Sequence, residues 1–324
     1  MDVLQEIKKP IDVYLSEYRC VFESFLVNDN SLLNSALKTV ASRQGKMMRP
    51  ILTLLVSNLL SKANSNSIYT AAAFEFFHTA SLLHDDIVDE SDQRRGNPSI
   101  NNLFGNKVAV LVGDYILANS LKCAAKTGCT QLVDIVSEAA QRLAGGEILQ
   151  LQNVANDSFS EDTYFDIIKG KTAALFAACC EGGALSVNAD ESDIERLKLF
   201  GEYIGICFQI RDDIFDYNDD PAIGKPTGND MKEGKLTLPV IYVILNSGDD
   251  TVYNLALKVR SGDASDSDIQ YLISYTKDNG GISYAQDRMM EYAEKAKSLL
   301  NVYPDSDVKQ ALCSYVDFVV GRKY

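Results

Sequence analysis

Apolar residues recur at three- and four-residue intervals through long segments of this 324-residue chain. That interval is the period of an α-helix with one buried face. Only seven prolines interrupt the chain, and short β-like runs such as 108–112 lack the alternation and turn pairs that accompany hairpin strands. The sequence therefore predicts an all-α fold, a bundle of roughly a dozen helices in a single domain over residues 1–324.

Eight segments show the helical period most clearly, and several follow a residue that suits an N-cap. The segments are 31–40, 71–86, 106–126, 132–152, 193–217, 238–246, 268–277 and 284–300. The predicted N-caps are Asn30, Ser160, Asp190, Ser265 with Asp268 three residues later, and Asp305. Two polar stretches between helices, 89–102 and 218–235, are the predicted functional loops.

The bulk composition excludes some functions and leaves others open. With 46% hydrophobic residues the chain can bury a sizeable core, and its net charge of −14 argues against a nucleic-acid partner. An acidic protein can still bind phosphates where metal ions or local basic residues reverse the charge. The seven cysteines have no metal-ligand spacing, and their odd number argues against a complete disulfide framework. Without a signal-peptide pattern or an apolar run of about 18 residues, we expect a cytoplasmic protein with no stable membrane anchor.

The strongest functional signal is a duplicated acidic motif. DDIVD ends one apolar helical segment and DDIFD ends another; the acidic residues are Asp85, Asp86 and Asp89, then Asp212, Asp213 and Asp216. At about 100° per residue, positions four apart share a helix face. One such cluster is usually a solvated helix end. Two matched clusters beside apolar segments place like charges one turn apart, which destabilises a helix unless a cation offsets the repulsion.

The ligand types in these motifs favour one metal. Carboxylate oxygens, without Cys or His at ligand spacing, select Mg²⁺ rather than zinc. Mg²⁺ keeps several waters and binds one or two carboxylates together with substrate phosphates, so the expected ligand is a diphosphate. Calcium in an EF-hand is the competing metal site, but neither stretch has that loop's alternating ligands and central glycine.

Basic residues near the acidic motifs suit two anion sites, one metal-mediated and one metal-free. In GKMMRP, Lys46 and Arg49 are three residues apart at an expected helix start, where they would share one face. Arg94 and Arg95 follow the first acidic motif, and three lysines lie near the second: Lys171, Lys225 and Lys235. A surface basic residue alone is usually solvated. Together these residues fit two diphosphate substrates that meet head to tail.

The motifs, in their order, resemble those of the trans (E-type) isoprenyl diphosphate synthases over essentially the whole chain. The ordered set is GKMMRP, FHTASLLHDDIVDESDQRRG, VAVLVGDYIL, AGGEILQ, KGKTAALF, FQIRDDIFDY and GKPTGNDMKEGKLTLP. The resemblance implies a helical bundle around a deep central cavity, generally a homodimer. It also implies a prenyltransferase that joins an allylic diphosphate, such as farnesyl or geranyl diphosphate, to isopentenyl diphosphate.

The resemblance assigns a role to each matching position. Asp85 and Asp89 would ligate two Mg²⁺ and Asp212 a third, with Asp86, Asp213 and Asp216 in support. The allylic diphosphate would be held by Arg94, Lys171, Lys225 and Lys235, and isopentenyl diphosphate by Lys46, Arg49, His78 and Arg95. Thr172 and Gln209 would lie beside the reacting carbons and, with Lys171, are the predicted catalytic residues. His84 receives no ligand role, and we expect a structural histidine there.

Residues one turn before Asp85 carry a hypothesis about product length. Short-chain members of the family close their cavity there with large or aromatic side chains, whereas this chain has Ala80 and Ser81. One helical turn adds about 5.4 Å of depth, close to one isoprene unit, so an open turn favours a polyprenyl product of roughly C30 to C50 for quinone side chains. Phe76 and Phe77, one turn further on, are candidates for the cavity floor. The alternative is that Ala80 and Ser81 are small because two helices pack closely there.

Three other functions are less consistent with the motifs. A short-chain farnesyl or geranylgeranyl diphosphate synthase shares the reaction but differs in product. A terpene cyclase would replace the second DDxxD with an Asn/Ser/Glu-type triad and would lack GKMMRP. A non-catalytic regulatory subunit would lose one or both acidic motifs, whereas all six aspartates are present here.

Overall fold

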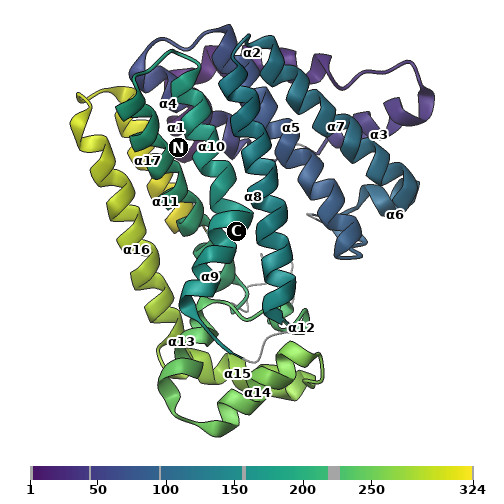
Figure 1. The fold of residues 1–324 in the computed structure, drawn as a ribbon, viewed down its shortest axis with the longest axis vertical. Coiled ribbons are helices and arrows are strands. Elements are labelled where there is room, and N and C mark those ends of the chain that lie inside the picture. Colours follow the sequence, from purple (N-terminus) through teal and green to yellow (C-terminus); the bar gives the residue numbers. More distant parts are fainter. Residues whose placement is uncertain (1–2, 44, 95, 155–157, 218–226, 323–324) are drawn as a thin grey trace. The chain divides into compact units, whose positions relative to one another are not determined.

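The computed structural model describes residues 3–43, 45–94, 96–154, 158–217 and 227–322, and these are almost entirely helical (Figure 1). The predicted all-α fold class is confirmed. The only strands among the described residues are β1 (Gln93–Arg94) and β2 (Asn97–Pro98), a short antiparallel pair that the sequence did not predict. Gly96 has a φ of 74° between the two strands, a left-handed value that glycine adopts without strain.

Contacts divide the chain into two compact units. Unit 1 comprises Met1–Ala140, Leu175–Gly201 and Leu300–Tyr315, and unit 2 comprises Gln141–Ala174, Glu202–Leu299 and Val316–Tyr324. Four helices contribute residues to both units: α8 (Thr130–Val154), α10 (Ala174–Leu185), α11 (Glu191–Phe215) and α17 (Asp307–Gly321). The single domain inferred from the sequence stays a prediction.

Unit 1 is built around α5 (Ser65–Val88), in which every residue from Thr70 to Phe77 is buried. A helix buried on all sides is expected to be mostly apolar, and within this segment only Thr70 and Glu75 are polar. Its Phe76 ring stacks on Phe22 at 4.3 Å, and the Ala73 carbonyl accepts a hydrogen bond from Ser120 (2.7 Å). The other elements are α1 (Val3–Lys8), η1 (Lys9–Ile11), α2 (Asp12–Ser24), α3 (Ser31–Ala41), α4 (Met48–Leu60), α6 (Ile100–Phe104), α7 (Asn106–Lys126), α10 (Ala174–Leu185) and η4 (Leu300–Val302).

Unit 2 has α13 (Leu238–Ser247) as its most apolar helix, and Pro239 in its first turn suits a helix start. Gly281, which begins α16 (Gly281–Leu299), lies so close to the Pro239 carbonyl that a Cβ there would be 2.5 Å from it. Helices α14 (Asp250–Ser261) and α15 (Asp266–Asp278) lie beside α13, and α12 (Asn229–Lys232) contacts α14 (Figure 1, green). The unit is completed by α9 (Glu161–Ile168) and the π-helical turn η2 (Lys169–Ala173).

Each of the eight predicted helical segments corresponds to a helix. The predicted caps are confirmed at four positions, since the side chains of Asn30, Ser160, Asp190 and Ser265 accept backbone N–H bonds. The cap predicted at Asp305 is wrong. The cap of α17 is Ser306, whose hydroxyl accepts the Lys309 N–H (3.1 Å), because the Asp305 carboxylate pairs with the Lys309 ammonium instead (3.0 Å).

Helix α7 is the one helix in the described part of the chain that is long and apolar enough to cross a membrane, and 44% of its apolar window is buried. Its buried face packs along α5. A core helix passes the same test of length and composition, so this match is weak evidence for a membrane span.

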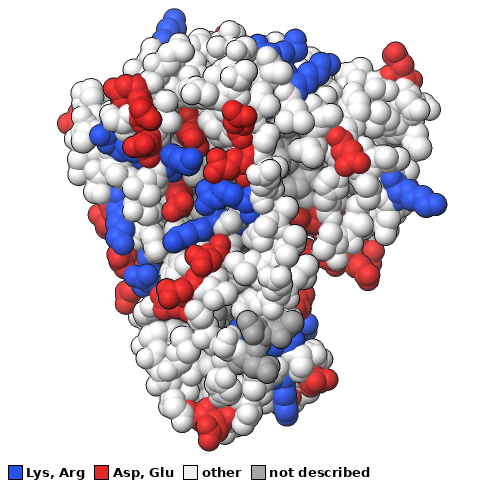
Figure 2. Space-filling model, viewed as in Figure 1, with Lys and Arg blue, Asp and Glu red and all other residues white. Residues whose placement is uncertain are grey.

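Acidic and basic side chains lie close together on the face shown in Figure 2. Ion pairs occur in both units, for example Lys198 with Glu181 (3.0 Å) in unit 1 and Arg142 with Glu202 (3.8 Å) in unit 2. Partly exposed pairs of this kind contribute little stability. They do offset local positive charge, so this face is not a broad basic surface.

Candidate active site

The first acidic cluster lies at the carboxyl end of α5. The Asp89 N–H donates to the Asp85 carbonyl (2.8 Å), which keeps the two residues one helical turn apart although the helix ends at Val88. The carboxyl end of a helix carries partial negative charge, and α5 has no basic residue in its last turn. Carboxylates at this position repel both each other and the helix dipole, so a bound cation would relieve the repulsion.

Asp86 differs from its neighbours because it is buried. Its carboxylate accepts a hydrogen bond from the Arg94 Nε at 2.6 Å. Burial raises the pKa of the Asp86 carboxyl, and Arg94 lowers it by less. Asn101 on α6 also donates to the Asp86 backbone carbonyl (3.3 Å), which ties α6 to the end of α5. The Asp86 carboxylate therefore holds the Arg94 side chain, and its supporting role at the metal site stays a prediction.

A cavity of about 540 Å³ lies in unit 1 beside this cluster. It brings together two predicted binding residues, His78 and Arg94, with Asp86 and the buried Glu75. Gly45 also lines it, next to the predicted Lys46.

The prediction that Lys46 and Arg49 share a helix face is wrong. Helix α4 begins at Met48, and Met47 before it has a left-handed φ of 57°. Lys46 therefore precedes the helix and does not follow its periodicity. The Arg49 guanidinium lies over the Phe176 ring, 5.0 Å from its centre.

His84 has the surroundings of a structural histidine. Its Nε2 lies 3.4 Å from an Asp114 carboxylate oxygen and 3.4 Å from the Val110 carbonyl. Its ring rests directly on Gly113, where a Cβ would be 2.4 Å from Nε2. The glycine in VAVLVGDYIL is therefore required by helix packing between α5 and α7.

The second acidic cluster lies at the end of α11, and its three aspartates have three different partners. Asp212 pairs with Arg322, which follows α17 (2.5 Å). Asp213 accepts hydrogen bonds from the Tyr164 hydroxyl (2.5 Å) and from the Gln209 amide (2.8 Å). Asp216, just past the helix, accepts the first backbone N–H groups of α12, from Asn229 (2.9 Å) and Asp230 (3.2 Å).

Asp213 is the most buried of the six, with 2% of its surface exposed. Burial raises its pKa well above the ordinary value, and the neighbouring Asp230 raises it further, while the bonds from Tyr164 and Gln209 act in the opposite direction. Burial also raises the pKa of Tyr164, so its hydroxyl keeps its proton and is the donor in the contact with Asp213.

The π-helical turn η2 presents Lys171 and Thr172. Such turns widen a helix locally and often occur at functional sites. The turn passes close to α8, since a Cβ on Gly146 would lie 2.6 Å from the Lys171 nitrogen. The Lys171 ammonium pairs with Glu147 on α8 (2.5 Å) and donates to Gln150 (3.4 Å). The Thr172 hydroxyl donates to the Gln209 side-chain oxygen (2.7 Å).

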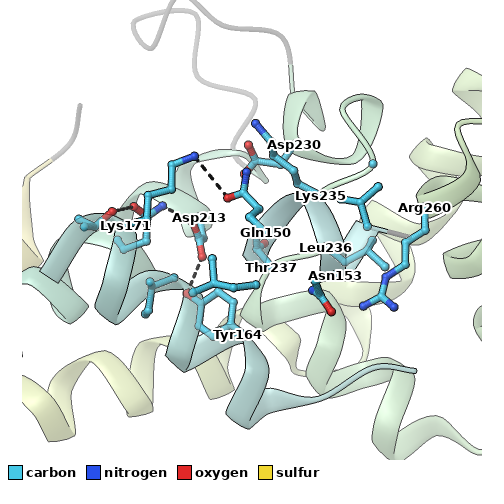
Figure 3. Close-up of a pocket in the computed structure, with 16 residues that line it drawn as sticks. Gln150, Asn153, Tyr164, Lys171, Asp213, Asp230, Lys235, Leu236, Thr237 and Arg260 are labelled. Carbon is cyan, nitrogen blue, oxygen red and sulfur yellow. Dashed lines mark hydrogen bonds between the residues drawn. The ribbon is translucent and has the colours of Figure 1, made fainter. Parts of the chain in front are cut away.

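These groups line a cavity of about 140 Å³ within unit 2 (Figure 3). It brings together five predicted site residues: Lys171, Thr172, Gln209, Asp213 and Lys235. In Figure 3, Lys171 reaches toward Gln150 and Tyr164 toward Asp213. Lys235 pairs with Glu233 (2.7 Å).

Sequence reasoning missed several residues of this site. Gln150 and Asp230 lie within motifs that the sequence singles out, so a systematic inspection of those motifs could find them. Tyr164 is a lone aromatic residue, 49 positions from its partner Asp213, and nothing in the sequence marks it. The predicted ligands Arg95 and Lys225 lie outside the described residues.

The residues proposed to set product length lie on two faces of α5. Ala80 is 2% exposed and stands between Ala73 and His84, both of which contact α7. Ser81 is half-buried and donates to the His78 carbonyl (2.9 Å). Phe76 and Phe77 are buried, and the Phe76 ring is stacked on Phe22. Ala80 therefore also meets the alternative expectation of a small residue where two helices pack closely.

The donor set fits magnesium. Each cluster offers carboxylate oxygens only, and the described residues contain no group of three or more possible ligands gathered at one point. One or two carboxylates per ion, completed by waters and phosphate oxygens, is the coordination Mg²⁺ prefers. A site for zinc or a protein-caged calcium would need more protein ligands than this.

Known proteins that are similar to this chain are prenyl diphosphate synthases. The sequence pattern of the polyprenyl synthetase family matches residues 30–276. An octaprenyl diphosphate synthase from Haemophilus influenzae is 34% identical over 322 residues, covering 99% of this chain and 98% of that protein. The structure is similar to a geranylgeranyl pyrophosphate synthase from Bacteroides thetaiotaomicron (47% identity, TM-score 0.88, covering 99% and 100% of the two chains). It is also similar to a polyprenyl synthase from Caulobacter crescentus complexed with calcium and isoprenyl diphosphate (31% identity, TM-score 0.92, 99% and 98%).

The protein is a prenyltransferase. Its all-α fold, its two aspartate-rich helix ends and the lysines on its π-helical turn agree with the activity for which these relatives are named. The chain belongs to the polyprenyl synthetase family.

Proposed function

We propose that the protein condenses an allylic diphosphate with isopentenyl diphosphate in a Mg²⁺-dependent reaction and repeats the condensation to a long all-trans polyprenyl diphosphate. The observation that carries this proposal is the pair of carboxylate clusters at the ends of α5 and α11. Neither helix has a basic residue in its last turn, so both clusters suit a cation that is bound together with a diphosphate.

The proposed metal site and the two proposed diphosphate sites use different residues. Asp85, Asp89 and Asp212 are the proposed metal ligands, for three ions in each active site. Lys171, Lys235 and Lys225 with Arg94 would bind the allylic diphosphate, and Lys46, Arg49, His78 and Arg95 would bind isopentenyl diphosphate. When bound, Mg²⁺ would draw negative charge onto the leaving diphosphate and so favour breaking of the allylic C–O bond.

The chain's own groups would then guide the organic fragment. The oxygens of Thr172 and Gln209, which hydrogen-bond to each other, can steady the positive charge that develops on the allylic carbon. The anion-binding residues hold the double bond of isopentenyl diphosphate beside that carbon, which is proximity catalysis. A carbon–carbon bond forms, the departing diphosphate takes the proton that is lost, and apolar walls exclude water from the cation.

We further propose a homodimer in the cytoplasm. Helix α7 leaves an apolar stripe uncovered, with Val110, Leu111 and Leu121 40%, 66% and 42% exposed. Val110 and Leu121 are three turns apart and therefore share a face. A second copy of the chain on this stripe would bury the apolar surface, as homodimer interfaces do.

The proposed product is roughly C30 to C50, because Ala80 and Ser81 leave the turn before Asp85 without a bulky side chain, and each open turn adds about one isoprene unit. A short-chain product is the second candidate. Two observations favour it: the relative with 47% identity is named a geranylgeranyl synthase, and Phe76 is stacked on Phe22 two turns below Asp85.

A single assay tests the reaction and separates the candidates. The purified chain is incubated with farnesyl diphosphate, labelled isopentenyl diphosphate and Mg²⁺, and the carbon number of the product is read by chromatography. We expect a ladder that ends beyond geranylgeranyl. Asp85→Ala and Asp212→Ala should each abolish condensation while circular dichroism shows a folded protein.

Other outcomes are equally informative. A product no longer than geranylgeranyl would establish the short-chain alternative. No product at all would favour a regulatory subunit. Full turnover in excess chelator would refute the metal role.

A further inference from the structure

Arg322, directly after α17, is held against α11 by its side chain and its backbone, and the contacting residues of both segments belong to unit 2. Its Nη2 donates to Asp212 Oδ1 at 2.5 Å and to the Phe208 carbonyl at 3.0 Å. The Arg322 side chain is 12% exposed, whereas that of Asp212 is 43% exposed. The arginine is therefore the more fixed member of the pair.

Most of the contacts of Arg322 do not involve Asp212. Its guanidinium lies over the Phe208 ring, 3.8 Å from the centre, a cation–π contact. Its backbone carbonyl accepts two hydrogen bonds from Arg211, at 3.0 Å and 2.8 Å. Because these contacts are independent of the carboxylate, the guanidinium would keep its place when Asp212 takes another partner.

The contact fixes the direction of the Asp212 side chain. The guanidinium binds one oxygen, and a carboxylate has two oxygens with about four acceptor sites. A carboxylate that ligates a metal is normally held by such a hydrogen bond, which orients it toward the ion. An isolated half-exposed aspartate would instead change rotamer freely and would lose entropy on binding.

We propose that Arg322 is a positioning residue for the metal site: it holds Asp212 Oδ1 so that the carboxylate presents its other oxygen to the ion. This inference rests on the proposed function, in which Asp212 is a metal ligand. The opposite role is a competing cation that occupies Asp212 and must leave before the metal binds. The two roles predict opposite changes when the arginine is removed.

The test is a binding measurement. Mn²⁺ is titrated into the full chain in the presence of inorganic diphosphate, and free Mn²⁺ is followed by its electron paramagnetic resonance signal. Asp212→Ala identifies the binding event that depends on this carboxylate. In Arg322→Gln that event should be about tenfold weaker. Unchanged or tighter binding would overturn the proposal, and tighter binding would establish the competing-cation role.

Two further variants separate geometry from charge and from folding. Arg322→Lys keeps the charge but loses the planar, forked guanidinium, so Mn²⁺ binding should also weaken. If the lysine variant binds Mn²⁺ as the wild type does, the guanidinium has no special role. Arg196→Gln is a matched control, because Arg196 also pairs with an aspartate, Asp193 (2.6 Å), and lies over a ring, that of Tyr303. This control should leave Mn²⁺ binding unchanged, and melting curves of all variants verify the fold.

Turnover distinguishes this inference from the proposed function. If the wild type binds Mn²⁺ through Asp212 but makes no prenyl product, the proposed function fails and the positioning role stands. If turnover is normal and Arg322→Gln binds metal normally, only the positioning role fails. Raising the Mg²⁺ concentration should restore the turnover of Arg322→Gln. If the variant were instead generally misfolded, added Mg²⁺ would not restore its turnover.

Discussion

Asp212, Asp213 and Asp216 stand within five residues, yet each ties α11 to a different part of unit 2. Asp212 holds the residue after α17, Asp213 holds Tyr164 on α9, and Asp216 caps α12. The sequence motif DDIFD, which is typical of a metal site, therefore also joins α11 to three other segments of the structure. Mutation of any of the three combines a functional and a structural effect, and stability must be measured beside activity.

Asp213 gives a prediction about pH. Because burial raises its folded-state pKa above the value of about 4 expected in the unfolded chain, the native state binds the proton more tightly. Its contribution to stability in metal-free protein is therefore lost as pH rises from about 4 through the raised pKa. Asp213→Asn should gain stability relative to the wild type as pH rises above about 4, measured by urea unfolding over a series of pH values.

Asp268 supplies the control for this experiment. It is an exposed capping carboxylate whose pKa is lowered by the Ser265 hydrogen bonds. Its stabilising contribution is complete above the ordinary aspartate pKa, so Asp268→Asn should show a constant difference from the wild type over the same range. Parallel curves for wild type and Asp213→Asn would show that Asp213 does not carry the raised pKa.

The product-length hypothesis is best tested at Ser81. Ala80 is packed in the face of α5 that meets α7, so Ala80→Phe is expected to cost about 1–3 kcal/mol through overpacking. Ser81 is half-buried, and Ser81→Phe should fold and shorten the product. Chromatography of labelled products reads the length, with Ser81→Ala as the control that removes only the hydroxyl. Unchanged product from a folded Ser81→Phe protein would remove this turn as the length determinant.

At the scale of elements, the close approach of α8 to η2 places the lysine that is proposed to bind the allylic diphosphate. Gly146 has no room for a side chain against the Lys171 backbone, whereas nothing lies within 4 Å of a Cβ on its neighbour Gly145. The two adjacent glycines of one helix thus make a matched pair for mutation.

We predict that Gly146→Ala displaces η2 and raises the KM for the allylic diphosphate about tenfold or more, with a loss of about 1–3 kcal/mol in stability. Gly145→Ala should instead stabilise α8 by up to about 1 kcal/mol, because alanine is the better helix former. Steady-state kinetics and thermal unfolding measure both effects. Equal behaviour of the two variants would contradict the role of the close approach.

Sequence reasoning recovered the elements better than the contacts between them. Helical period and capping residues are local, so the long helices and four of five caps are confirmed. The prediction that Lys46 and Arg49 share a helix face failed because Met47, between them, has a left-handed backbone and the helix begins only after it. A backbone turn before a helix leaves no periodic signal in the sequence. The pairing of Asp212 with Arg322 joins residues 110 positions apart, and only tertiary structure determines it.

At the scale of the whole molecule, the apolar stripe on α7 predicts association. Leu111→Glu and Leu121→Glu place a charge on exposed apolar positions and should yield monomers by light scattering, with little loss of monomer stability. Val13→Glu, at an exposed valine on α2, is the control and should leave the assembly unchanged. Dimers that persist in both α7 variants would exclude this stripe as the interface.

Two lysines that line the cavity of unit 2 are already paired with glutamates, Lys171 with Glu147 and Lys235 with Glu233. Because electrostatic attraction grows with charge, a singly charged anion such as chloride should displace a glutamate from its lysine less readily than a diphosphate does. A diphosphate accompanied by metal ions brings several charges at once and can replace both partners. We therefore expect these glutamates to disfavour the binding of singly charged anions and to favour a polyvalent ligand in the cavity.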